Sequence, residues 1–391
     1  MRVVRGLLLL LIATALSLPG AANAADKIKI GVISTFSGPS GFNGTSTRDA
    51  MNLALANLGG TLGGLPAQFL FEDDQQKPDQ GVAIANKYLR EDKVDMIVGA
   101  TFSNITIAMY VPIVKAETVI ISSIAGPSQI AGKGCSPYFF STSWQGDNFA
   151  EAMGAYLQGK GIQNIYLMAP NYAAGHDVLT GFKRYYKGKI ADEVYTPLDQ
   201  LDFTAELTTL RAANPAATFV FYPGGLGIQF VKQYAESGLR DKIPLYTAYT
   251  VDNSTLPAIG DDALGGITAT LWNAQLDNPA NQKFVSGFKA KYGYMPAEYS
   301  AQAYDTVNLI DSAVRAVKGD LTDKKALIAA IEKADFRSVR GSFRFNTNHF
   351  GIQNFYMEQV EKGPDGKPYL KLGDLALKDH GDAYADQCHM N

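Results

Sequence analysis

The sequence predicts an α/β protein that consists of two doubly wound, parallel-sheet units. The first observation is that short apolar runs alternate with loops and helical segments at a regular pitch, which is typical of parallel sheets with helices on both faces. The second is that this pattern restarts after a polar break at residues 141–143. The third is the amount of material, because 391 residues with 46 % hydrophobic side chains allow two or three domains with large cores.

The first unit is read from its opening strand onward. Residues 28–33 form a short, β-branched and mostly apolar run, which predicts a buried strand. A polar loop over 34–44 follows, and the apolar spacing of 48–58 then predicts a helix. By the same criteria we expect strands at 68–71, 94–99 and 119–122 and helices at 79–90 and 103–115.

The second unit has the same construction. We expect helices at 149–160, 176–186 and 228–236 and strands at 165–169, 218–222 and 244–247. Two long helices over 278–292 and 297–318 come next. Residues 339–345 and 354–360 are expected to form a closing β-ribbon, with a turn at 363–366 where the sequence reads Gly-Pro-Asp-Gly.

The first 24 residues have the pattern of a secretory signal peptide. Arg2 and Arg5 precede an apolar run over 7–18, and Ala22-Asn23-Ala24 fits a small-x-small cleavage site. The run is shorter than the roughly 20 residues that a membrane anchor needs. We therefore expect residues 1–24 to be removed on export. The residue after the cut, Ala25, is not a lipid-accepting Cys, so no lipid anchor is expected at the new N-terminus.

Export decides how the two cysteines are interpreted. Cys135 and Cys388 are the only pair in the chain, and exported proteins live in an oxidising compartment. We predict a Cys135–Cys388 disulfide that ties down the C-terminal tail. Two free thiols are the alternative.

Composition argues against several function classes. Lys and Arg total 35 against 38 Asp and Glu, so the net charge is −3 and the basic footprint of a nucleic-acid-binding protein is missing. The four histidines do not stand at metal-ligand spacing, and phosphate-loop and dinucleotide motifs are absent from the sequence, so no metal or cofactor is expected. An exported hydrolase that uses Ser103 or His176 is the enzyme alternative, but the sequence assembles no base for a nucleophile. We expect no catalytic residue.

The loops after the strands are the expected binding region. Ligands of open α/β sheets bind outside the carboxyl ends of the strands. Here these loops are rich in Ser, Thr, Gly, Asn and Tyr, which hydrogen-bond a small solute without charge. They span residues 36–43, 100–104, 123–128, 170–175, 223–225 and 248–252.

Several stretches, taken in order, resemble one family. They are Lys29–Ile33 with the Phe-Ser-Gly-Pro of 36–39, the Val-Gly-Ala-Thr-Phe-Ser-Asn of 98–104, 121–123, 171–177 and 299–305. Together they resemble the periplasmic solute-binding proteins of ABC transporters of the leucine/isoleucine/valine-binding type. The resemblance implies the type I periplasmic binding fold, in which three hinge segments join two lobes. The lobes would comprise residues 26–142 with 273–341, and residues 143–272 with 342–391.

The resemblance also implies a binding site. In such proteins a carboxylate is held at the helix start after the third strand, which here is Ser103 flanked by Phe102 and Asn104. The alternative is that Ser103 only caps its helix, although capping and binding are compatible. The next strand end would add Ser123, Ile124 and Ala125, and the solute body would contact Phe42 and the second-lobe residues Tyr172, Pro223 and Tyr249.

Two departures from the family direct the ligand prediction. Members that bind amino acids usually carry a hydroxyl near Gly126 and an acid within 246–251, whereas this chain has Gly126 and reaches an acid only at Asp252. Aromatic residues stand around the cleft loops at Phe36, Phe42, Phe102, Trp144, Tyr172, Tyr222 and Tyr249, although some of them could instead be lobe core. The Gly-Cys-Ser-Pro of 134–137 and the Cys-His-Met of 388–390 resemble the aromatic-acid branch of the family.

The expected function is therefore capture of a small carboxylate solute, with an aromatic acid favoured over a branched-chain amino acid. The protein would close over the solute as a monomer and deliver it to the membrane permease of an ABC transporter. A ligand-sensing receptor subunit of the same fold is a further alternative, which an adjacent permease gene would distinguish.

Overall fold

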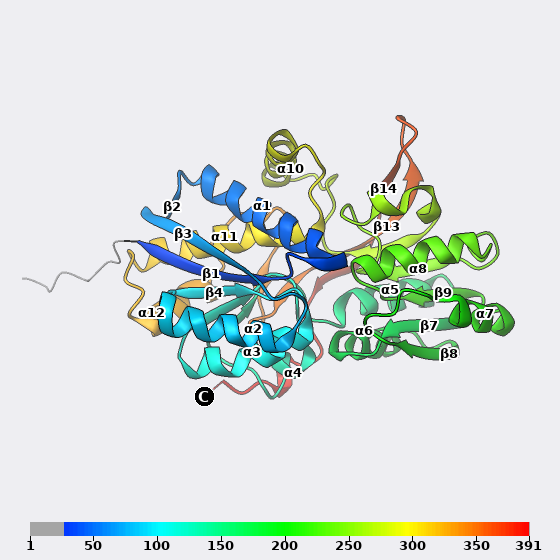
Figure 1. The fold of residues 1–391 in the computed structure, drawn as a ribbon, viewed down its shortest axis with the longest axis horizontal. Coiled ribbons are helices and arrows are strands. Elements are labelled where there is room, and N and C mark those ends of the chain that lie inside the picture. Colours follow the sequence, from blue (N-terminus) through cyan, green and yellow to red (C-terminus); the bar gives the residue numbers. More distant parts are fainter. Residues whose placement is uncertain (1–26, 391) are drawn as a thin grey trace, which may run out of the picture.

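The computed structural model describes residues 27–390, and the signal peptide expected over residues 1–24 lies outside them. The described chain forms two lobes that lie side by side, each with a β-sheet that has helices packed against it (Figure 1). The apolar strand runs fill the interior. All of Ile28, Ile30 and Val32 in the opening strand are fully buried, as expected for a sheet that is covered on both faces.

The first lobe holds a six-stranded sheet in the order β2-β3-β1-β4-β5-β6. The central strand β1 (Ile28–Ser34) runs parallel to β3 (Leu65–Asp73) and β4 (Met96–Gly99). Strands β5 (Val119–Ser122) and β6 (Phe139–Ser141) extend the parallel sheet, and β2 (Thr61–Leu62) forms an antiparallel edge. Its early helices are α1 (Gly41–Asn57), α2 (Pro78–Lys87), α3 (Ser103–Lys115) and α4 (Ser128–Ala131).

The second lobe holds an eight-stranded sheet. Its path is β12-β13-β11-β10-β9-β7-β8, and β14 pairs with β13. The parallel part comprises β7 (Asn164–Pro170), β8 (Lys189–Thr196), β9 (Ala217–Val220), β10 (Leu245–Ala248) and β11 (Ile267–Thr270). Its helices are α5 (Asn148–Gly159), α6 (Ala173–Tyr185), α7 (Thr204–Ala213), α8 (Gly225–Glu236) and α9 (Leu256–Ile259).

The chain passes between the lobes three times. It leaves the first lobe between β6 and α5, and returns between β11 and α10 (Pro279–Tyr292). Helices α10 and α11 (Glu298–Ala316) then pack against α1, and α12 (Lys324–Glu332) packs against α11. The third passage, after α12, leads to β12 (Arg344–Phe345) and then β13 (Gly351–Lys362) in the second sheet.

The predicted elements that differ most from the structure are helix α1 and the closing ribbon. Helix α1 begins at Gly41, seven residues before the predicted start, because tertiary packing overrides the weak helix propensity of its first turn. A Cβ on Gly44 would lie 2.3 Å from the carbonyl oxygen of Thr35, so only glycine lets this turn press against the preceding loop. The ribbon is also placed differently. The turn at 363–366 joins β13 (Gly351–Lys362) to β14 (Pro368–His380), and only β12 (Arg344–Phe345) lies within 339–345.

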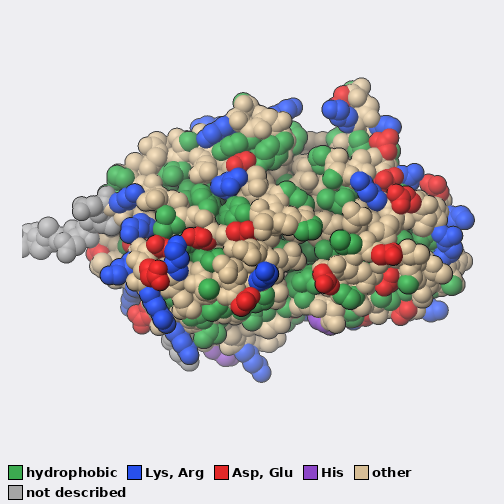
Figure 2. All heavy atoms as spheres, in the orientation of Figure 1, with side chains coloured by type: hydrophobic (Ala, Val, Ile, Leu, Met, Phe, Trp, Pro, Cys, Tyr) green, Lys and Arg blue, Asp and Glu red, His purple; other side chains and the backbone are tan. Residues whose placement is uncertain are grey.

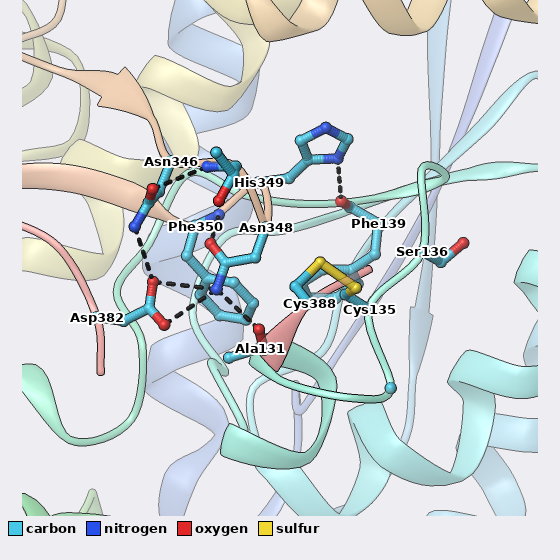
Figure 3. Close-up of a disulfide and its surroundings, with 12 residues drawn as sticks. Ala131, Cys135, Ser136, Phe139, Asn346, Asn348, His349, Phe350, Asp382 and Cys388 are labelled. Atoms are coloured by element: carbon cyan, nitrogen blue, oxygen red, sulfur yellow. Dashed lines mark hydrogen bonds between the residues drawn. A yellow bond between two sulfur atoms is a disulfide. The ribbon is translucent and has the colours of Figure 1, made fainter. Parts of the chain in front are cut away.

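The C-terminal tail runs from β14 in the second lobe back to the first lobe. The predicted disulfide is confirmed, since Cys388 is bonded to Cys135 in the segment between α4 and β6 (Figure 3). Asp382 anchors the same tail by accepting a hydrogen bond of 3.0 Å from Asn348 Nδ2, and the Tyr384 hydroxyl donates one of 2.9 Å to Asp147. The tail therefore adds a fourth, disulfide-closed link between the lobes.

The surface carries both signs of charge. On the face drawn in Figure 2, basic and acidic side chains are interspersed over both lobes rather than gathered by sign. Between residues 27 and 390, no helix combines the length and the hydrophobicity that crossing a membrane requires.

Candidate ligand-binding site

A cavity of about 440 Å³, its open mouth included, lies between the two lobes. Its walls come from the segments that follow β4, β5, β7, β9 and β10, with contributions from α1, α11 and the first passage between the lobes. The parallel strands of both sheets thus point their carboxyl ends at one space, as the topology of open sheets requires.

One end of the cavity is formed by the start of α3. Thr101, Phe102 and Ser103 line it, and Ser103 is the first residue of the helix. The residue before the helix is Phe102, whose side chain offers no acceptor for the free backbone N–H groups of the first turn. Ile105 and Thr106 find an acceptor in the Phe102 carbonyl at 3.1 and 3.0 Å. The N–H groups of Ser103 and Asn104 have no acceptor among the described residues.

This geometry favours an anion at the start of α3. Free N–H groups at a helix N-terminus, together with the partial positive charge of the helix dipole, form a binding site for a carboxylate. The alternative that Ser103 caps α3 is wrong, because Phe102 occupies the cap position. The Ser103 hydroxyl is therefore not committed to its own helix.

Gly126, at the next strand end, is required by close packing. A Cβ at this position would lie 1.8 Å from the carbonyl oxygen of Trp144, which is closer than atoms can approach. Gly146 on the same passage donates a backbone hydrogen bond of 2.6 Å to the Gly126 carbonyl. The missing hydroxyl near Gly126 thus has a steric reason, since the first passage between the lobes fills that space.

The rest of the wall is aromatic. Adjacent ring centroids are 4.8–6.4 Å apart around the cavity, in the order Phe102, Tyr172, Phe221, Tyr249, Trp144 and Tyr299. Phe102 and Tyr172 belong to different lobes, so this pair forms across the cleft. Such separations are typical of favourable aromatic pairs, and a flat apolar ligand would extend the same packing.

Tyr249 is held firmly in this wall. Its ring stacks on Phe149 with centroids 4.1 Å apart, and its hydroxyl donates to the Gly146 carbonyl at 3.3 Å. Its φ of 56° lies in the left-handed region, which is uncommon for a side chain of this size and occurs at functional sites. Burial raises the pKa of the Tyr249 hydroxyl well above its ordinary value, so the group is neutral and can donate a hydrogen bond.

The cavity itself has no charged lining residue among those described. His176 lies outside it and hydrogen-bonds Asn171 at 2.9 Å through Nε2. Ser103 consequently has no histidine, lysine or carboxylate beside it in the cavity wall that could act as a general base.

Three acids lie behind Tyr249, namely the buried Glu298 and Glu358 and the half-buried Asp252, and we call them the acidic cluster. Asp252 Oδ1 accepts from the Ser254 backbone at 2.7 Å, and Glu298 Oε2 accepts from the Thr270 hydroxyl at 2.6 Å. Burial, which the other acids reinforce, raises the pKa of Glu298 well above its ordinary value and that of Glu358 to about 8. Asp252 is thus turned away from the cavity and toward other acids.

Seven of the ten predicted site residues line the cavity, and they come from both lobes. These are Phe102, Ser103, Ile124, Ala125, Tyr172, Pro223 and Tyr249. Three do not line it, namely Phe42, Asn104 and Ser123. Phe42 is rotated away along α1 into a larger open groove, whereas Asn104 contributes only the backbone of the first turn of α3. Ser123 is buried and does not reach the cavity. The loop that contains it is held by a hydrogen bond that the Ser122 hydroxyl donates to the Ala125 carbonyl.

The sequence analysis did not name Asn43, Phe221 or Tyr299 as site residues, although all three line the cavity and Asn43 belongs to the expected binding loop over 36–43. Phe221 is the neighbour of Tyr222, which was predicted near the cleft but packs in the second-lobe core against Phe203. Phe36 likewise packs against Phe71 outside the cavity. Phe221 and Tyr222 directly follow β9, and the strand's alternation of side chains, continued over these two residues, is the signal that separates them.

Comparisons with known proteins agree with this architecture. A curated relative, Leu/Ile/Val-binding protein homolog 6 of Brucella melitensis, is 29 % identical, and the match covers 91 % of this chain and 93 % of the relative. A solute-binding protein of an ABC transporter from R. palustris, solved with benzoate, has a TM-score of 0.88 at 28 % identity and covers 93 % of this chain and 100 % of that one.

A second solved structure has the same kind of ligand. The solute-binding protein of an ABC transporter from Rhodopseudomonas palustris BisB5, in complex with 3,4-dihydroxybenzoic acid, has a TM-score of 0.84 at 30 % identity and covers 91 % of this chain and 99 % of that one. The fold of the present chain is accordingly the type I periplasmic binding fold, with two parallel-sheet lobes. A family model described as periplasmic binding protein matches residues 27–366, and the chain therefore belongs to the periplasmic binding protein family.

Proposed function

We propose that the protein is the solute-binding component of an ABC importer and that it captures an aromatic carboxylate between its lobes. The observation that carries the proposal is the pairing of an uncapped helix start with an uncharged, aromatic cavity. The carboxylate would accept hydrogen bonds from the N–H groups of Ser103 and Asn104 and from the Ser103 hydroxyl. The ring would lie among Tyr172, Phe221 and Tyr249.

The lining favours an aromatic acid over an amino acid. An α-ammonium group needs an acceptor or a negative charge, and burying it without one is costly. No acid is among the described lining residues, and Asp252 already accepts hydrogen bonds from Ser254 and Thr255. The two R. palustris proteins that are similar in sequence and fold hold benzoate and 3,4-dihydroxybenzoic acid, which supports the same ligand class here. The relative's name, Leu/Ile/Val-binding protein homolog 6, keeps a branched-chain amino acid as the alternative.

The transport cycle follows from the two-lobe architecture. We propose lobes of residues 26–142 with 273–341 and of residues 143–272 with 342–391, which rotate about the three passages between them. A solute that contacts both lobes favours the closed arrangement, because only there does it make all its contacts. The closed, monomeric protein would work in the periplasm after removal of residues 1–24 and would dock on the membrane permease.

Calorimetric titration of the exported protein, freed of bound solute, tests this function. Benzoate and 4-hydroxybenzoate are compared with benzamide, which keeps the ring but has no negative charge, and with leucine. We expect the acids to bind at least about 100-fold more tightly than benzamide, since hydrogen bonds to a charged group contribute about 1.5–3 kcal/mol each. Binding of leucine alone would establish the branched-chain alternative, and no heat with any carboxylate would refute the proposed function.

A further inference from the structure

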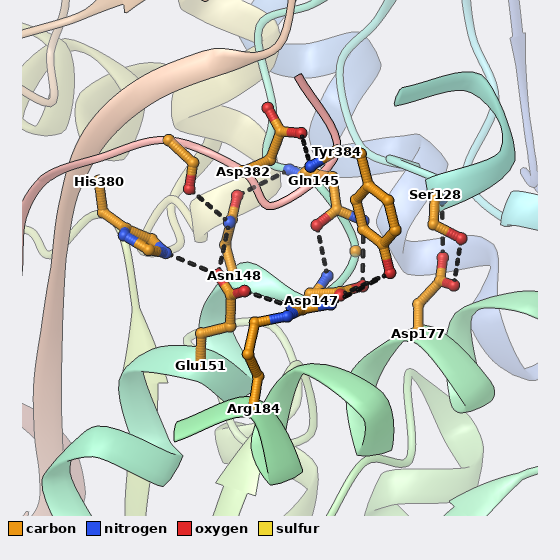
Figure 4. Close-up of polar contacts among 12 residues, drawn as sticks. Ser128, Gln145, Asp147, Asn148, Glu151, Asp177, Arg184, His380, Asp382 and Tyr384 are labelled. Carbon is orange, nitrogen blue, oxygen red and sulfur yellow. Dashed lines mark hydrogen bonds and ion pairs between the residues drawn. The ribbon is translucent and has the colours of Figure 1, made fainter. Parts of the chain in front are cut away.

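One polar contact beside the cavity joins the two lobes directly. Asp177 lies on α6 of the second lobe and Ser128 begins α4 of the first (Figure 4). The Asp177 Oδ2 atom accepts a hydrogen bond of 2.9 Å from the Ser128 backbone N–H, and Oδ1 accepts one of 2.6 Å from the Ser128 hydroxyl. Both carboxylate oxygens of Asp177, in the second lobe, thus accept hydrogen bonds from a single residue of the first lobe.

The contact depends on the lobes being close together. Asp177 is only 6 % exposed, and the element that contributes both of its hydrogen-bond donors is α4 on the other side of the cleft. A rotation that separates the lobes by a few ångströms would break both hydrogen bonds, because their strength falls steeply with distance. The carboxylate would then be exposed to water. The pair consequently distinguishes a closed cleft from an open one.

The charged side chains described near Asp177 do not take the place of Ser128 as its hydrogen-bond partner. Arg184, on the same helix, lies within ion-pair distance of Asp147 and Glu151 instead (Figure 4). The neighbouring His176 hydrogen-bonds Asn171, and the Tyr172 hydroxyl is neutral because burial raises its pKa. The position of Asp177 therefore matters for closure rather than for an ion pair within its own lobe.

The contact is also close to the ligand cavity. Ala174 and Val178, which flank Asp177 on α6, line the cavity, as does Gly146. A Cβ on Gly146 would lie 3.0 Å from Asp177 Oδ2, so the carboxylate sits directly behind the cavity wall. A solute that draws α6 toward the first lobe would bring Asp177 to Ser128 in the same movement.

We propose that Asp177 and Ser128 form a latch that holds the cleft closed over a bound solute. Asp177 is a positioning residue in this proposal, since it acts through the movement of the lobes and does not touch the solute. The proposal rests on the proposed function, because it assumes that a solute enters the cavity. The latch forms whenever the lobes close, which a bound solute favours, so losing it raises the rate of release more than it changes the rate of entry.

The test is a stopped-flow measurement of 4-hydroxybenzoate entry and release in the full-length exported protein. The variants are Asp177→Asn, Ser128→Ala and the double variant, with Asp241→Asn, an exposed carboxylate of the second lobe, as the matched control. We expect the release rate of Asp177→Asn to rise about 10-fold or more, in line with the loss of hydrogen bonds to a charged group. The entry rate should stay within about 3-fold of wild type and of the control.

The double variant separates a latch from a general structural role. We expect Ser128→Ala to add less than about 2-fold to the release rate when Asp177 is already Asn, because the two side chains act through one contact. Equal release rates in wild type and Asp177→Asn, or fully independent effects of the two substitutions, would overturn the latch.

Small-angle X-ray scattering tests the latch independently of the proposed function. Wild-type protein that binds none of the acids would refute the proposed function, but its radius of gyration without solute would still test the latch. We expect a larger radius for Asp177→Asn than for Asp241→Asn. Identical radii of the two variants would contradict the latch.

Discussion

Replacing Glu358 by Gln should reduce the pH dependence of the free energy of unfolding. Glu358 is 4 % exposed and belongs to the acidic cluster with Asp252 and Glu298. Its Oε1 accepts a hydrogen bond of 2.5 Å from Asn273 Nδ2. Arg340, the buried cation that also feels the charge of Glu298, is paired with Asp305 at 2.9 Å. Negative charge on the acidic cluster is therefore only weakly offset by this buried cation.

The magnitude follows from the pKa of Glu358, which burial raises from 4.5 to about 8. Between these two values the folded protein holds a proton that the unfolded chain has released, so stability falls as the pH rises through this window. The slope from one such group is about 1.4 kcal/mol per pH unit, which gives a loss of up to about 5 kcal/mol by pH 8. Below pH 4.5 the group is protonated in both states and the loss disappears.

Denaturant unfolding at pH 5.5, 6.5, 7.5 and 8.5 measures this slope. Gln has the same shape and still accepts the Asn273 hydrogen bond, so Glu358→Gln should gain stability over wild type as the pH rises. Glu361→Gln, on the same strand but half-exposed and paired with Lys371 at 2.9 Å, is the control and should run parallel to wild type. Parallel pH profiles of wild type and Glu358→Gln would refute the reasoning.

Three further predictions concern the ligand and the tail. Ser103→Ala should weaken benzoate binding about 10-fold or more by removing one donor to the carboxylate, and unchanged affinity in calorimetry would exclude that role. Tyr249→Ala should weaken binding by a similar factor, whereas Tyr249→Phe, which keeps the ring, should stay within about 3-fold of wild type. Cys388→Ser should lower the free energy of unfolding by about 2–5 kcal/mol, as reduction of wild type should, because Cys135 and Cys388 close a long loop. Equal denaturation midpoints with and without reductant would contradict this last expectation.

The sequence predicted best where a pattern depends on local packing alone. Helix α3 occupies residues 103–115 as predicted, because a buried parallel strand and an apolar helix alternate clearly there. Strand β1 was also predicted to within one residue. Helix α1 was predicted too short, since its glycine-rich first turn is helical only through contacts with the β1 loop.

The site residues that were missed depend on rotation and on distant packing. Phe42 was predicted and Asn43 lines the cavity, a difference of one position that turns a helical side chain by about 100°. Phe221 and Tyr222 differ in a similar way directly after β9, where neighbouring side chains still face opposite sides. Tyr299 reaches the cavity because α11 returns to pack on α1, and no local sequence pattern encodes that contact.

The structure of the protein in complex with 4-hydroxybenzoate is the most direct test of how it holds its solute. The account predicts both carboxylate oxygens within hydrogen-bond distance of the start of α3, at the N–H groups of Ser103 and Asn104. The ring should lie between Tyr172 and Tyr249. A carboxylate bound instead against the second lobe, or a solute found outside the space between the lobes, would contradict the account.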